Sequence, residues 1–283
     1  MPRVVKNPQS NSLWCALRPF SLVVAIISAG LGIALAWQHG HAEPGLAVLV
    51  MLGAMLSQSG VNLINDLEDL SLGLVKQQTV RNCILRNAAV GVLCLAIAVG
   101  IGGYLAWLRG WPLLVIMLLS GVLALNYNLG PIHFKRRGLA VLQVFVLMGV
   151  VLVQGAYMAM GGGLSTQVIV LSLPISCLVS LLLLSNELRD WESDRRDHVR
   201  TLTVRVGYRR AVQLYWGLVV TAYVSSIGLL WGTSHTVIWL LAPLPLLLPI
   251  RQHLRAEHRP RLTPLTGRFF FAFGLAYLAA LHW

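Results

Sequence analysis

Charged side chains are the scarcest feature of this sequence. Only 11% of its 283 residues are Asp, Glu, Lys or Arg, whereas 57% are hydrophobic, and the mean hydropathy is +0.72. Soluble globular domains carry about 25% charged residues. The composition therefore excludes an ordinary soluble domain and predicts a protein that crosses a membrane several times.

Cysteine pairs and zinc-type histidine spacings are also missing. The four cysteines, Cys15, Cys83, Cys94 and Cys177, form no CxxC pair, which argues against a cysteine metal site and against a disulfide framework. The eight histidines show no HxxxH or HExxH spacing, so we expect no zinc site. The side chains left for metal binding are those that offer oxygen atoms.

Apolar runs long enough to cross a bilayer recur along the whole chain. A membrane-spanning helix needs about 20 apolar residues. On that basis we predict one all-α integral membrane domain over residues 1–283, with nine transmembrane helices and a segment, 1–19, before the first of them. The predicted spans are 20–38, 46–65, 87–107, 111–126, 138–158, 167–185, 211–231, 235–250 and 269–282. The fourth, eighth and ninth are the shortest, so their ends are the least well defined.

Basic residues lie almost entirely on one side of these spans. If the N-terminus is cytoplasmic, Arg109 is the only one of the 22 Lys and Arg residues that falls in a predicted outer loop. Cytoplasmic loops of membrane proteins are enriched in Lys and Arg. We therefore predict a cytoplasmic N-terminus, and we attribute the net charge of +12 to membrane orientation. The expected partner is the lipid bilayer, and no nucleic acid.

Acidic residues gather in two short stretches. Eight of the ten lie within 66–69 and 187–197, and only Glu43 and Glu257 lie elsewhere. Each stretch follows a long apolar run, and in each an Asn and two Asp share one face of a helix. The first set is Asn62, Asp66 and Asp69, at i, i+4 and i+7, and the second is Asn186, Asp190 and Asp194, at i, i+4 and i+8.

The two acid sets are predicted to face each other. Asn62 and Asp66 recur as Asn186 and Asp190 at the same offset of 124 residues, which hints at two quasi-repeated halves. Carboxylates of membrane helices are costly, and they usually line a cavity or an ion site. We therefore expect one polar cavity at the cytoplasmic rim, with one acid set on either side.

The chemistry of these side chains favours a metal-bound diphosphate. Carboxylate and amide oxygens suit a hard cation such as Mg²⁺, which completes its shell with water and substrate phosphate oxygens. Two Mg²⁺ ions could bridge a diphosphate whose hydrocarbon tail lies among the apolar helices. Departure of that diphosphate from an allylic carbon, followed by capture of the carbocation by an electron-rich acceptor, is the favoured reaction. Nearby basic residues that could neutralise the phosphates are Lys135, Arg136, Arg137, Arg189, Arg200 and Arg205.

Four motifs resemble, in their order, those of the UbiA-type intramembrane prenyltransferases. Asn-x-x-Asn-Asp-x-x-Asp-x-x-x-Gly, at 62–73 of this sequence, resembles the first aspartate motif of that family. Asn-x-x-Arg-Asp-x-x-x-Asp at 186–194, together with Thr-Leu-Thr-Val-Arg-Val-Gly at 201–207, resembles the family's second aspartate motif. The connecting loop is similar to Tyr-Asn-Leu-Gly-Pro at 127–131, and the N-terminal signature to Leu-Arg-Pro at 17–19.

This resemblance implies a fold, a reaction and a location. It implies nine helices around a central cavity, two Mg²⁺ ions, a polyprenyl diphosphate donor and an aromatic acceptor. Gly73 in place of a third aspartate, together with the 201–207 pattern, resembles the 1,4-dihydroxy-2-naphthoate polyprenyltransferase branch. That branch implies menaquinone biosynthesis, a demethylmenaquinone formed with loss of the acceptor's carboxylate, and a bacterial inner-membrane enzyme whose site faces the cytoplasm.

Two departures from the family pattern bear on the acceptor. Val199-Arg200 stands before Thr201 where the family usually has Gly-Lys, and Arg and Lys are not equivalent phosphate ligands. The loop at 127–131 carries Asn-Leu where the family often has Thr-Gly. Another aromatic ring, or a lipid or other non-aromatic nucleophile, therefore stays open as the acceptor. Tail length, general base and oligomeric state are not predicted.

The acid sets and the resemblance together assign roles to individual residues. The predicted catalytic Mg²⁺ ligands are Asp66, Asp69, Asp190 and Asp194, with Asn62 and Asn186 completing the metal shell. The predicted diphosphate-binding residues are Arg18, Lys135, Arg189, Arg200, Tyr127, Asn62, Asn65 and Asn186. Three acids fall off the two sets, and we expect them to be solvated or ion-paired: Glu68, Glu192 and Asp197.

Two other kinds of protein could carry the same acids. A cation-coupled secondary transporter also has intramembrane acids near broken helices. It predicts acids near the bilayer midplane, whereas these stretches lie at the predicted rim. A catalytically silent binding protein of the same fold does not explain why both acid sets are complete.

Overall fold

Every regular element in the described part of the chain is a helix. The computed structural model describes residues 12–67, 70, 75, 77–127, 133–231, 235–256 and 259–282, and the statements below refer to these. Within these ranges no residue lies in a β-strand. The predicted all-α class is therefore confirmed.

Prolines begin three of the helices in the first half of the chain. These helices are α1 Leu13–Leu17, α2 Pro19–Gln38, α3 Pro44–Ile64, α5 Gln78–Arg109 and α6 Trp111–Leu125. Pro19 and Pro44 are the first residues of α2 and α3, and Pro112 is the second of α6. Proline suits the first turn because its fixed φ is helical and its missing N–H would have no partner there. Arg18, with a φ of 50°, separates α1 from α2.

The second half of the chain alternates long spans with short helices. Its elements are η2 Phe134–Arg137, α7 Ala140–Val144, η3 Phe145–Val151, α8 Leu152–Ala159, α9 Thr166–Arg189, α10 Trp191–Arg196, α11 Leu202–Val206, α12 Tyr208–Leu230, η4 His235–Leu241, η5 Leu244–Leu246, α13 Leu247–Arg255 and α14 Leu262–His282. The π-helical η3 joins α7 to α8 without a break, so Ala140–Ala159 form one span.

Eight helices of the described residues are long and apolar enough to cross a membrane. They correspond to eight of the nine predicted spans. The ninth prediction, 111–126, corresponds to α6, whose 15 residues reach about 22 Å against a hydrocarbon core of about 30 Å. All nine predicted spans are thus helical, and α6 is the short one.

Four helices extend at least four residues beyond the predicted spans, which corrects their boundaries. α5 begins at 78 instead of 87, α9 ends at 189 instead of 185, α13 ends at 255 instead of 250, and α14 begins at 262 instead of 269. Hydropathy identifies only the part of a helix that lies in lipid, whereas backbone hydrogen bonds continue the helix into polar sequence. The extension of α9 matters most, because it places Asn186 and Arg189 on the helix itself.

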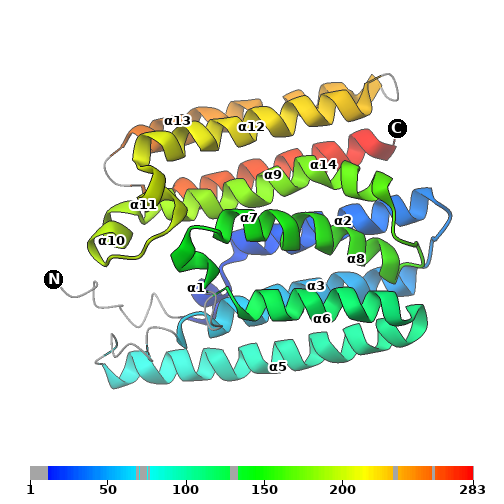
Figure 1. Ribbon diagram of the computed structural model, residues 1–283, viewed down its shortest axis with the longest axis horizontal. Helices are drawn as coiled ribbons and strands as arrows, with labels where there is room; N and C mark the ends of the chain where they lie inside the picture. The colour runs from blue at the N-terminus through cyan, green and yellow to red at the C-terminus, as the bar shows by residue number, and fades with distance from the viewer. Residues whose placement is uncertain are drawn as a thin grey trace.

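The long helices pack in layers along one common direction. Figure 1 shows α3, α5 and α6 on one side of the molecule, α12 and α13 on the other, and α2, α7, α9 and α14 between them. α9 is the most enclosed: it contacts α2, α7, η3, α12 and α14, and 15 of its 24 residues are buried. A helix that is covered all round is expected to be apolar all round, and before Asn186 the polar side chains that α9 buries are all serines: Ser172, Ser176, Ser180 and Ser185.

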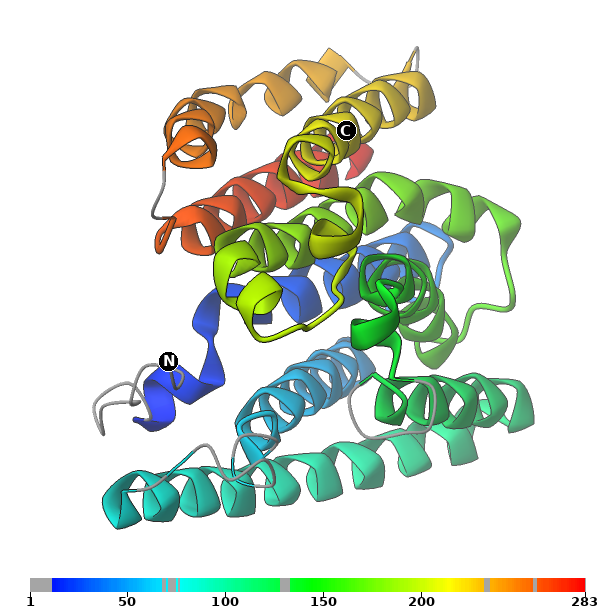
Figure 2. The ribbon, with the colours of Figure 1, turned by 60° about the vertical axis from the view of Figure 1, so that its left-hand side comes forward.

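One end of the bundle collects the segments that carry the motifs. Figures 1 and 2 show α1, α10 and α11 at the same end, beside the ends of α3 and α9. We call this end the aspartate end and the opposite one the far end. The prediction that both acid sets lie at one rim agrees with this arrangement.

Arg109, the single basic residue predicted on the outer side, closes the far end of the bundle. Its Nε donates to the Ala159 carbonyl at 3.0 Å and its Nη2 to the Met160 carbonyl at 3.1 Å, beyond the last turn of α8. Nη2 also lies 3.4 Å from Oε1 of Glu43. Carbonyls at a helix C-terminus have no partner within the helix, so Arg109 ties α5 to the end of α8.

Two glycines bring α3 and α5 into close contact below the first acid set. A Cβ added to Gly91 of α5 would lie 2.9 Å from Cβ of Leu63 and 3.0 Å from the Gly60 carbonyl oxygen of α3. Small residues let membrane helices approach at backbone distance. Leu63 directly follows Asn62, so this contact fixes the part of α3 that carries the first acid set.

Gly91→Ala is predicted to destabilise the protein by about 1–3 kcal/mol, because the added methyl group must push α3 away from α5. Gly103→Ala on the same helix is the matched control, since a Cβ at Gly103 meets nothing within 4 Å. Alanine in an unobstructed helix position is favoured over glycine by about 0.5–1 kcal/mol, so the control should be neutral or stabilising. Thermal unfolding in one detergent measures both, and equal shifts would refute the contact.

Candidate active site

Asn62 attaches the end of α3 to the break between α1 and α2. The residue is 6% exposed, and its Nδ2 donates to the Leu17 carbonyl at 2.8 Å and to Ser21 Oγ at 2.7 Å. Its Oδ1 accepts a hydrogen bond from Nε2 of Gln58 at 3.2 Å. Both amide hydrogens are used within the protein, so this structure gives Asn62 a positioning role. The predicted ligand role could fall only to Oδ1.

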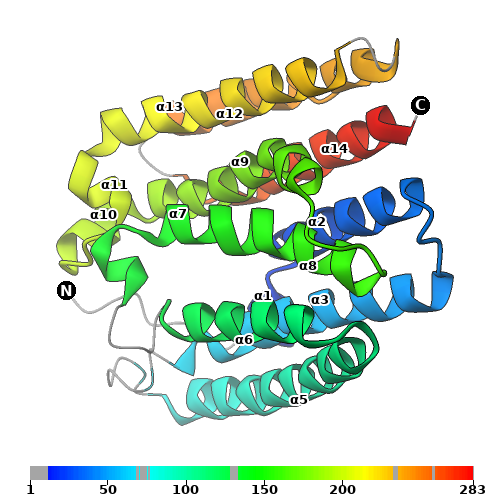
Figure 3. The same ribbon diagram turned by 45° about the vertical axis from the view of Figure 1, so that its right-hand side comes forward.

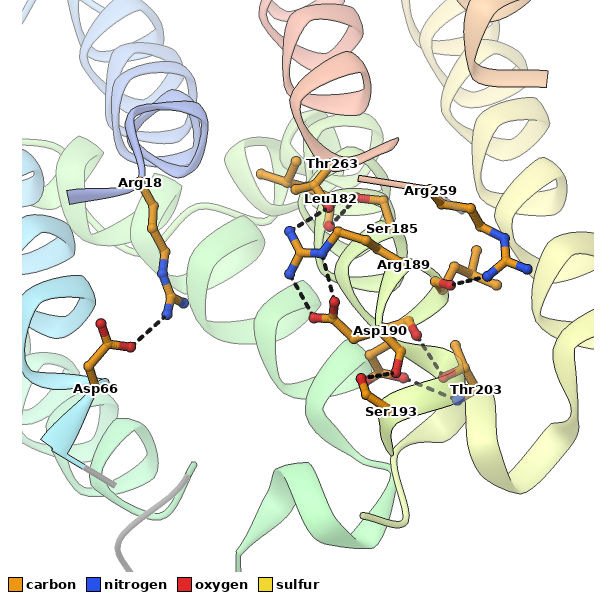
Figure 4. A network of polar contacts seen from close by, with 12 residues as sticks. Arg18, Asp66, Leu182, Ser185, Arg189, Asp190, Ser193, Thr203, Arg259 and Thr263 are labelled. Carbon is orange, nitrogen blue, oxygen red and sulfur yellow. Dashed lines mark hydrogen bonds and ion pairs between the residues drawn. The ribbon is translucent and has the colours of Figure 1, made fainter. Parts of the chain in front are cut away.

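Asp66 lies just beyond α3, within reach of Arg18. Nη2 of Arg18 and Oδ1 of Asp66 are 3.5 Å apart, and their side chains are 38% and 13% exposed. The N–H and the hydroxyl of Ser21 both bind the Arg18 carbonyl at 2.8 Å, which fixes the backbone from which the guanidinium extends. Figure 4 shows this guanidinium directed at Asp66. The structure thus brings together two predicted site residues, with Asn65 between α3 and Asp66.

Asp190 is bound on both oxygens by its neighbour Arg189. Nε of Arg189 lies 2.8 Å from Oδ1, and Nη2 lies 2.6 Å from Oδ2. The third guanidinium nitrogen, Nη1, lies 3.4 Å from Oγ1 of Thr263 in α14 (Figure 4). A fork that binds a carboxylate at two points has the same geometry toward a phosphate. Arg189 can therefore exchange Asp190 for phosphate oxygens without leaving its place.

The last turn of α9, which presents the second acid set, is closed by three different elements. Carbonyls at a helix C-terminus need partners from outside the regular helix, and here three of them have one. The three bonds are Asp190 N–H to Asn186 O (3.0 Å), Thr203 Oγ1 to Glu187 O (3.3 Å) and Arg259 Nη1 to Leu188 O (3.3 Å). The chain beyond Asp190, the helix α11 and the segment before α14 together fix where the second set points.

Glu187 is a buried acid that the sequence interpretation did not single out. It is 6% exposed, and its Oε2 accepts the Thr203 N–H at 3.1 Å, which caps the first turn of α11. Its Oε1 is buried with no hydrogen-bond partner in the described part of the chain. The signal that could have found it is its position: a carboxylate inside the apolar run that forms α9 is costly and needs a reason.

Lys135 and Tyr127 are brought together by backbone contacts. The N–H of Lys135, in η2, donates to the Tyr127 carbonyl at 3.4 Å, and both side chains are half-buried. The charge of Lys135 also acts on the buried carboxylate of Glu187. This places the predicted diphosphate-binding lysine of the connecting loop near the second acid set, as the sequence predicts.

Asp194 and Arg200 lie in the segment between α9 and α11. The N–H of Asp194 binds the Asp190 carbonyl at 2.8 Å, and its own carbonyl accepts the Val199 N–H at 2.8 Å. The segment thus folds back on itself, and the charge of Asp194 acts on Glu187. Arg200 is exposed at this end. Its role on the diphosphate stays a prediction.

Several predicted residues lie outside the described ranges: Asp69, Glu68, Gly73, Gly130 and Pro131. Within the described ranges, no three His, Cys, Asp or Glu side chains gather into a metal site. The acids that are described offer oxygen ligands only, and Asp66 and Asp190 each contact one arginine. That donor set fits Mg²⁺, which takes one or two carboxylates and leaves the rest of its shell to water and phosphate.

Comparison with known sequences decides the family. The UbiA prenyltransferase family model matches residues 23–275. This chain belongs to the UbiA prenyltransferase family. It is therefore a prenyltransferase, and the secondary transporter considered from the sequence is set aside.

Relatives of this UbiA-family enzyme include two named for one reaction. The 1,4-dihydroxy-2-naphthoate octaprenyltransferase of Bacillus subtilis is 28% identical over 79% of this chain and 75% of its own length. The enzyme of the same name from Escherichia coli is 28% identical over 87% and 85%. A solved UbiA homologue from Archaeoglobus fulgidus, bound to GPP and Mg²⁺, shares the fold with a TM-score of 0.64 at 17% identity, covering 95% of this chain and all of that one.

Arg259 is a second residue that the sequence interpretation missed in this UbiA-family enzyme. Its Nη1 lies 2.9 and 3.0 Å from the two carboxylate oxygens of Glu192, and its guanidinium lies 4.3 Å from the ring centre of Tyr208. The pair joins α10 to the segment before α14 and to α12. The expectation that Glu192 is ion-paired and not a metal ligand fits this contact. Arg259 itself was one arginine among many in a basic loop, so composition could not identify it.

Arg259→Met is predicted to lower the free energy of unfolding by about 1–2 kcal/mol. The substitution keeps the length of the side chain but removes the bonds to Glu192 and to the Leu188 carbonyl. The expected loss in the free energy of unfolding is this small because Glu192 is 47% exposed and is hydrated by water when its partner is lost. Thermal unfolding measures the loss; Arg259→Lys, which keeps the charge, should lose less, and an unchanged Met variant would refute the contact.

Proposed function

We propose that this UbiA-family prenyltransferase transfers a polyprenyl group from a polyprenyl diphosphate to 1,4-dihydroxy-2-naphthoate, in a Mg²⁺-dependent reaction that yields a demethylmenaquinol, the reduced form of a demethylmenaquinone. The observation that carries the proposal is that acids of both sets lie at one end of an apolar helix bundle, and that Asp66 and Asp190 each contact an arginine. Two relatives named naphthoate octaprenyltransferases support the acceptor. The solved homologue bound to GPP and Mg²⁺ supports the donor and the metal.

We place the aspartate end on the cytoplasmic side of a bacterial inner membrane. The sequence leaves Arg109 as the one basic residue in the predicted outer loops. Arg109 is the last residue of α5, and α5 ends at the far end of the bundle (Figure 1). Since Lys and Arg concentrate on the cytoplasmic side, the aspartate end is the cytoplasmic one. A diphosphate head can then enter from water while its tail stays among the apolar helices.

The arginines beside the acids would hold the diphosphate. Arg18 and Arg189 come from opposite halves of the chain, and each already contacts one carboxylate, so both can turn to phosphate oxygens. Lys135 and Arg200 would add positive charge. The allylic C–O bond breaks and its electron pair leaves with the diphosphate. The allylic carbon then bonds to the ring carbon that carries the acceptor's carboxylate. The C–CO₂ bond breaks, its electron pair restores the aromatic ring, and CO₂ leaves, so the product is the quinol.

The acids would serve the metal. Bound Mg²⁺ supplies positive charge to the leaving diphosphate. Asp66 and Asp69 on the first segment, and Asp190 and Asp194 on the second, would hold it as two ions. Asn62, by fixing α3 to the α1–α2 break, keeps Asp66 and Arg18 at a constant separation.

A product assay tests the proposal. Purified enzyme in lipid nanodiscs is given geranyl to octaprenyl diphosphates with 1,4-dihydroxy-2-naphthoate, 4-hydroxybenzoate or a glycerophosphate lipid, and products are identified by mass spectrometry. We expect naphthoate to be prenylated with loss of CO₂, and EDTA to stop the reaction until Mg²⁺ is restored. Prenylation of another acceptor alone would reassign the acceptor, and turnover that is unaffected by EDTA would refute the metal.

A further inference from the structure

An apolar crevice opens on the outer surface of the bundle between α7 and α12. Figures 1 and 3 show these two helices flanking α9 on one side of the molecule. The crevice has a volume of about 310 Å³ and is lined by Gly138, Leu139, Val141, Leu142, Phe145, Ser180, Leu202 and Leu218. Leu142 is 62% exposed. The Ser180 hydroxyl donates a hydrogen bond to the Val141 carbonyl at 3.0 Å, so the lining presents mainly hydrocarbon to a ligand.

A guanidinium lies at the mouth of this crevice, at the aspartate end. Arg205 packs directly on Gly138: a Cβ there would lie 2.7 Å from Cδ and 3.0 Å from Nε of Arg205. Gly138 has a φ of 73°, in the region that favours glycine. Arg205 donates to the carbonyls of Arg200 at 3.0 Å and Arg136 at 3.1 Å. These bonds fix the guanidinium in place and leave its positive charge without a carboxylate partner among the described residues.

Four of the elements that line the crevice contain no acidic residue. No acidic residue lies between Asp69 and Glu187, or between Asp197 and Glu257. The lining elements α7, η3, α11 and α12 fall wholly within those intervals. Arg136 and Arg137, which precede Gly138 directly, add to the charge of Arg205 and are both exposed. A hydrocarbon crevice with a cationic mouth is complementary to a molecule with an anionic head and a hydrocarbon chain.

We propose that this crevice binds an anionic phospholipid, with one acyl chain between α7 and α12 and the phosphate at Arg205 and Arg137. No lining residue is among those assigned to the metal or the diphosphate. Arg205 and Arg137, which the sequence also offered as neighbours of the substrate phosphates, are assigned to the lipid phosphate instead. A second copy of this chain fits less well, because a two-fold contact would set Arg205 and Arg137 of the two copies against each other.

Native mass spectrometry of the delipidated, full-length protein tests the site, with phosphatidylglycerol and phosphatidylcholine of identical chains as probes. We expect phosphatidylglycerol to bind roughly 30-fold more tightly than phosphatidylcholine, as two cation–headgroup contacts would give. Leu142→Trp fills the crevice and should abolish the preferential binding. Leu118→Trp is the matched control, because Leu118 is 61% exposed on α6, away from the crevice; it should behave as the unsubstituted protein.

Arg205→Gln is a second, independent variant, and it should remove the preference for phosphatidylglycerol while leaving weak binding of either lipid. Equal binding of the two lipids to the unsubstituted protein would overturn the proposal. So would unchanged phosphatidylglycerol binding in Leu142→Trp, which would mean that the basic surface alone attracts lipid. A dimer that Leu142→Trp dissociates would assign the crevice to a second copy of the chain. Displacement of phosphatidylglycerol by farnesyl diphosphate, lost in Leu142→Trp, would assign it to the substrate. Either result would also overturn the proposal.

Discussion

Asp190→Asn should lower prenyl transfer roughly 100- to 1,000-fold, the range seen when one group that stabilises transition-state charge is removed. Asparagine has nearly the shape of aspartate, and its amide oxygen can still accept one bond from Arg189. What is lost is the negative charge that would hold Mg²⁺ beside the diphosphate. Turnover measured against Mg²⁺ concentration should show both a lower maximum and a higher Mg²⁺ requirement.

Asp197→Asn is the control for that substitution. Asp197 also lies at the aspartate end, at the end of α10, and is exposed and outside both acid sets. The same loss of one charge there should leave turnover and its Mg²⁺ dependence within about twofold, because screened surface charges contribute little. Asp190→Asn with normal turnover and a normal Mg²⁺ curve would show that Asp190 is not a metal ligand.

The sequence predicts the fold better than it predicts the role of each polar residue. Long apolar runs and one-sided basic charge depend only on composition along the chain, so the spans and the shared rim of the acid sets could be found. Asn62 shows the limit. It lies on the predicted face, but its amide hydrogens bind Leu17 and Ser21, 45 and 41 positions away. A spacing rule cannot tell a ligand from a residue that positions one.

The residues that sequence reasoning missed act through contacts that only the fold creates. Arg259 closes the end of α9 from 71 positions away, and nothing in its local sequence distinguishes it from its basic neighbours. Glu187 was visible as an acid near the second set, but its bond to Thr203 depends on the fold of the segment between them. Both residues fix the end of α9, which carries the second acid set. Their contacts depend on tertiary packing, and tertiary packing leaves no periodic pattern in the sequence.

Glu187→Ala is predicted to lower the free energy of unfolding by about 2–4 kcal/mol. It removes a charge-assisted bond and leaves the buried Thr203 N–H at the start of α11 without an acceptor, and each loss costs about 1–3 kcal/mol. Because α11 carries Arg205, which binds the Arg136 carbonyl, the loss should also loosen the loop that carries Lys135. We therefore expect the KM for prenyl diphosphate to rise in the folded fraction.

Two milder substitutions distinguish the two contributions of Glu187, its hydrogen bond that caps α11 and its negative charge. Glu187→Gln keeps an oxygen for the Thr203 N–H and should recover most of the stability, because Oε1 of Glu187 has no hydrogen-bond partner among the described residues to lose. Thr203→Val keeps that N–H but removes the hydroxyl bond to the Glu187 carbonyl, at a cost of about 1 kcal/mol. Thermal unfolding should thus rank the variants as Gln, Val and Ala in order of increasing loss. If Gln is as damaging as Ala, the negative charge and not the helix cap is what α11 requires, and Glu187 acts directly on the charged groups of the site.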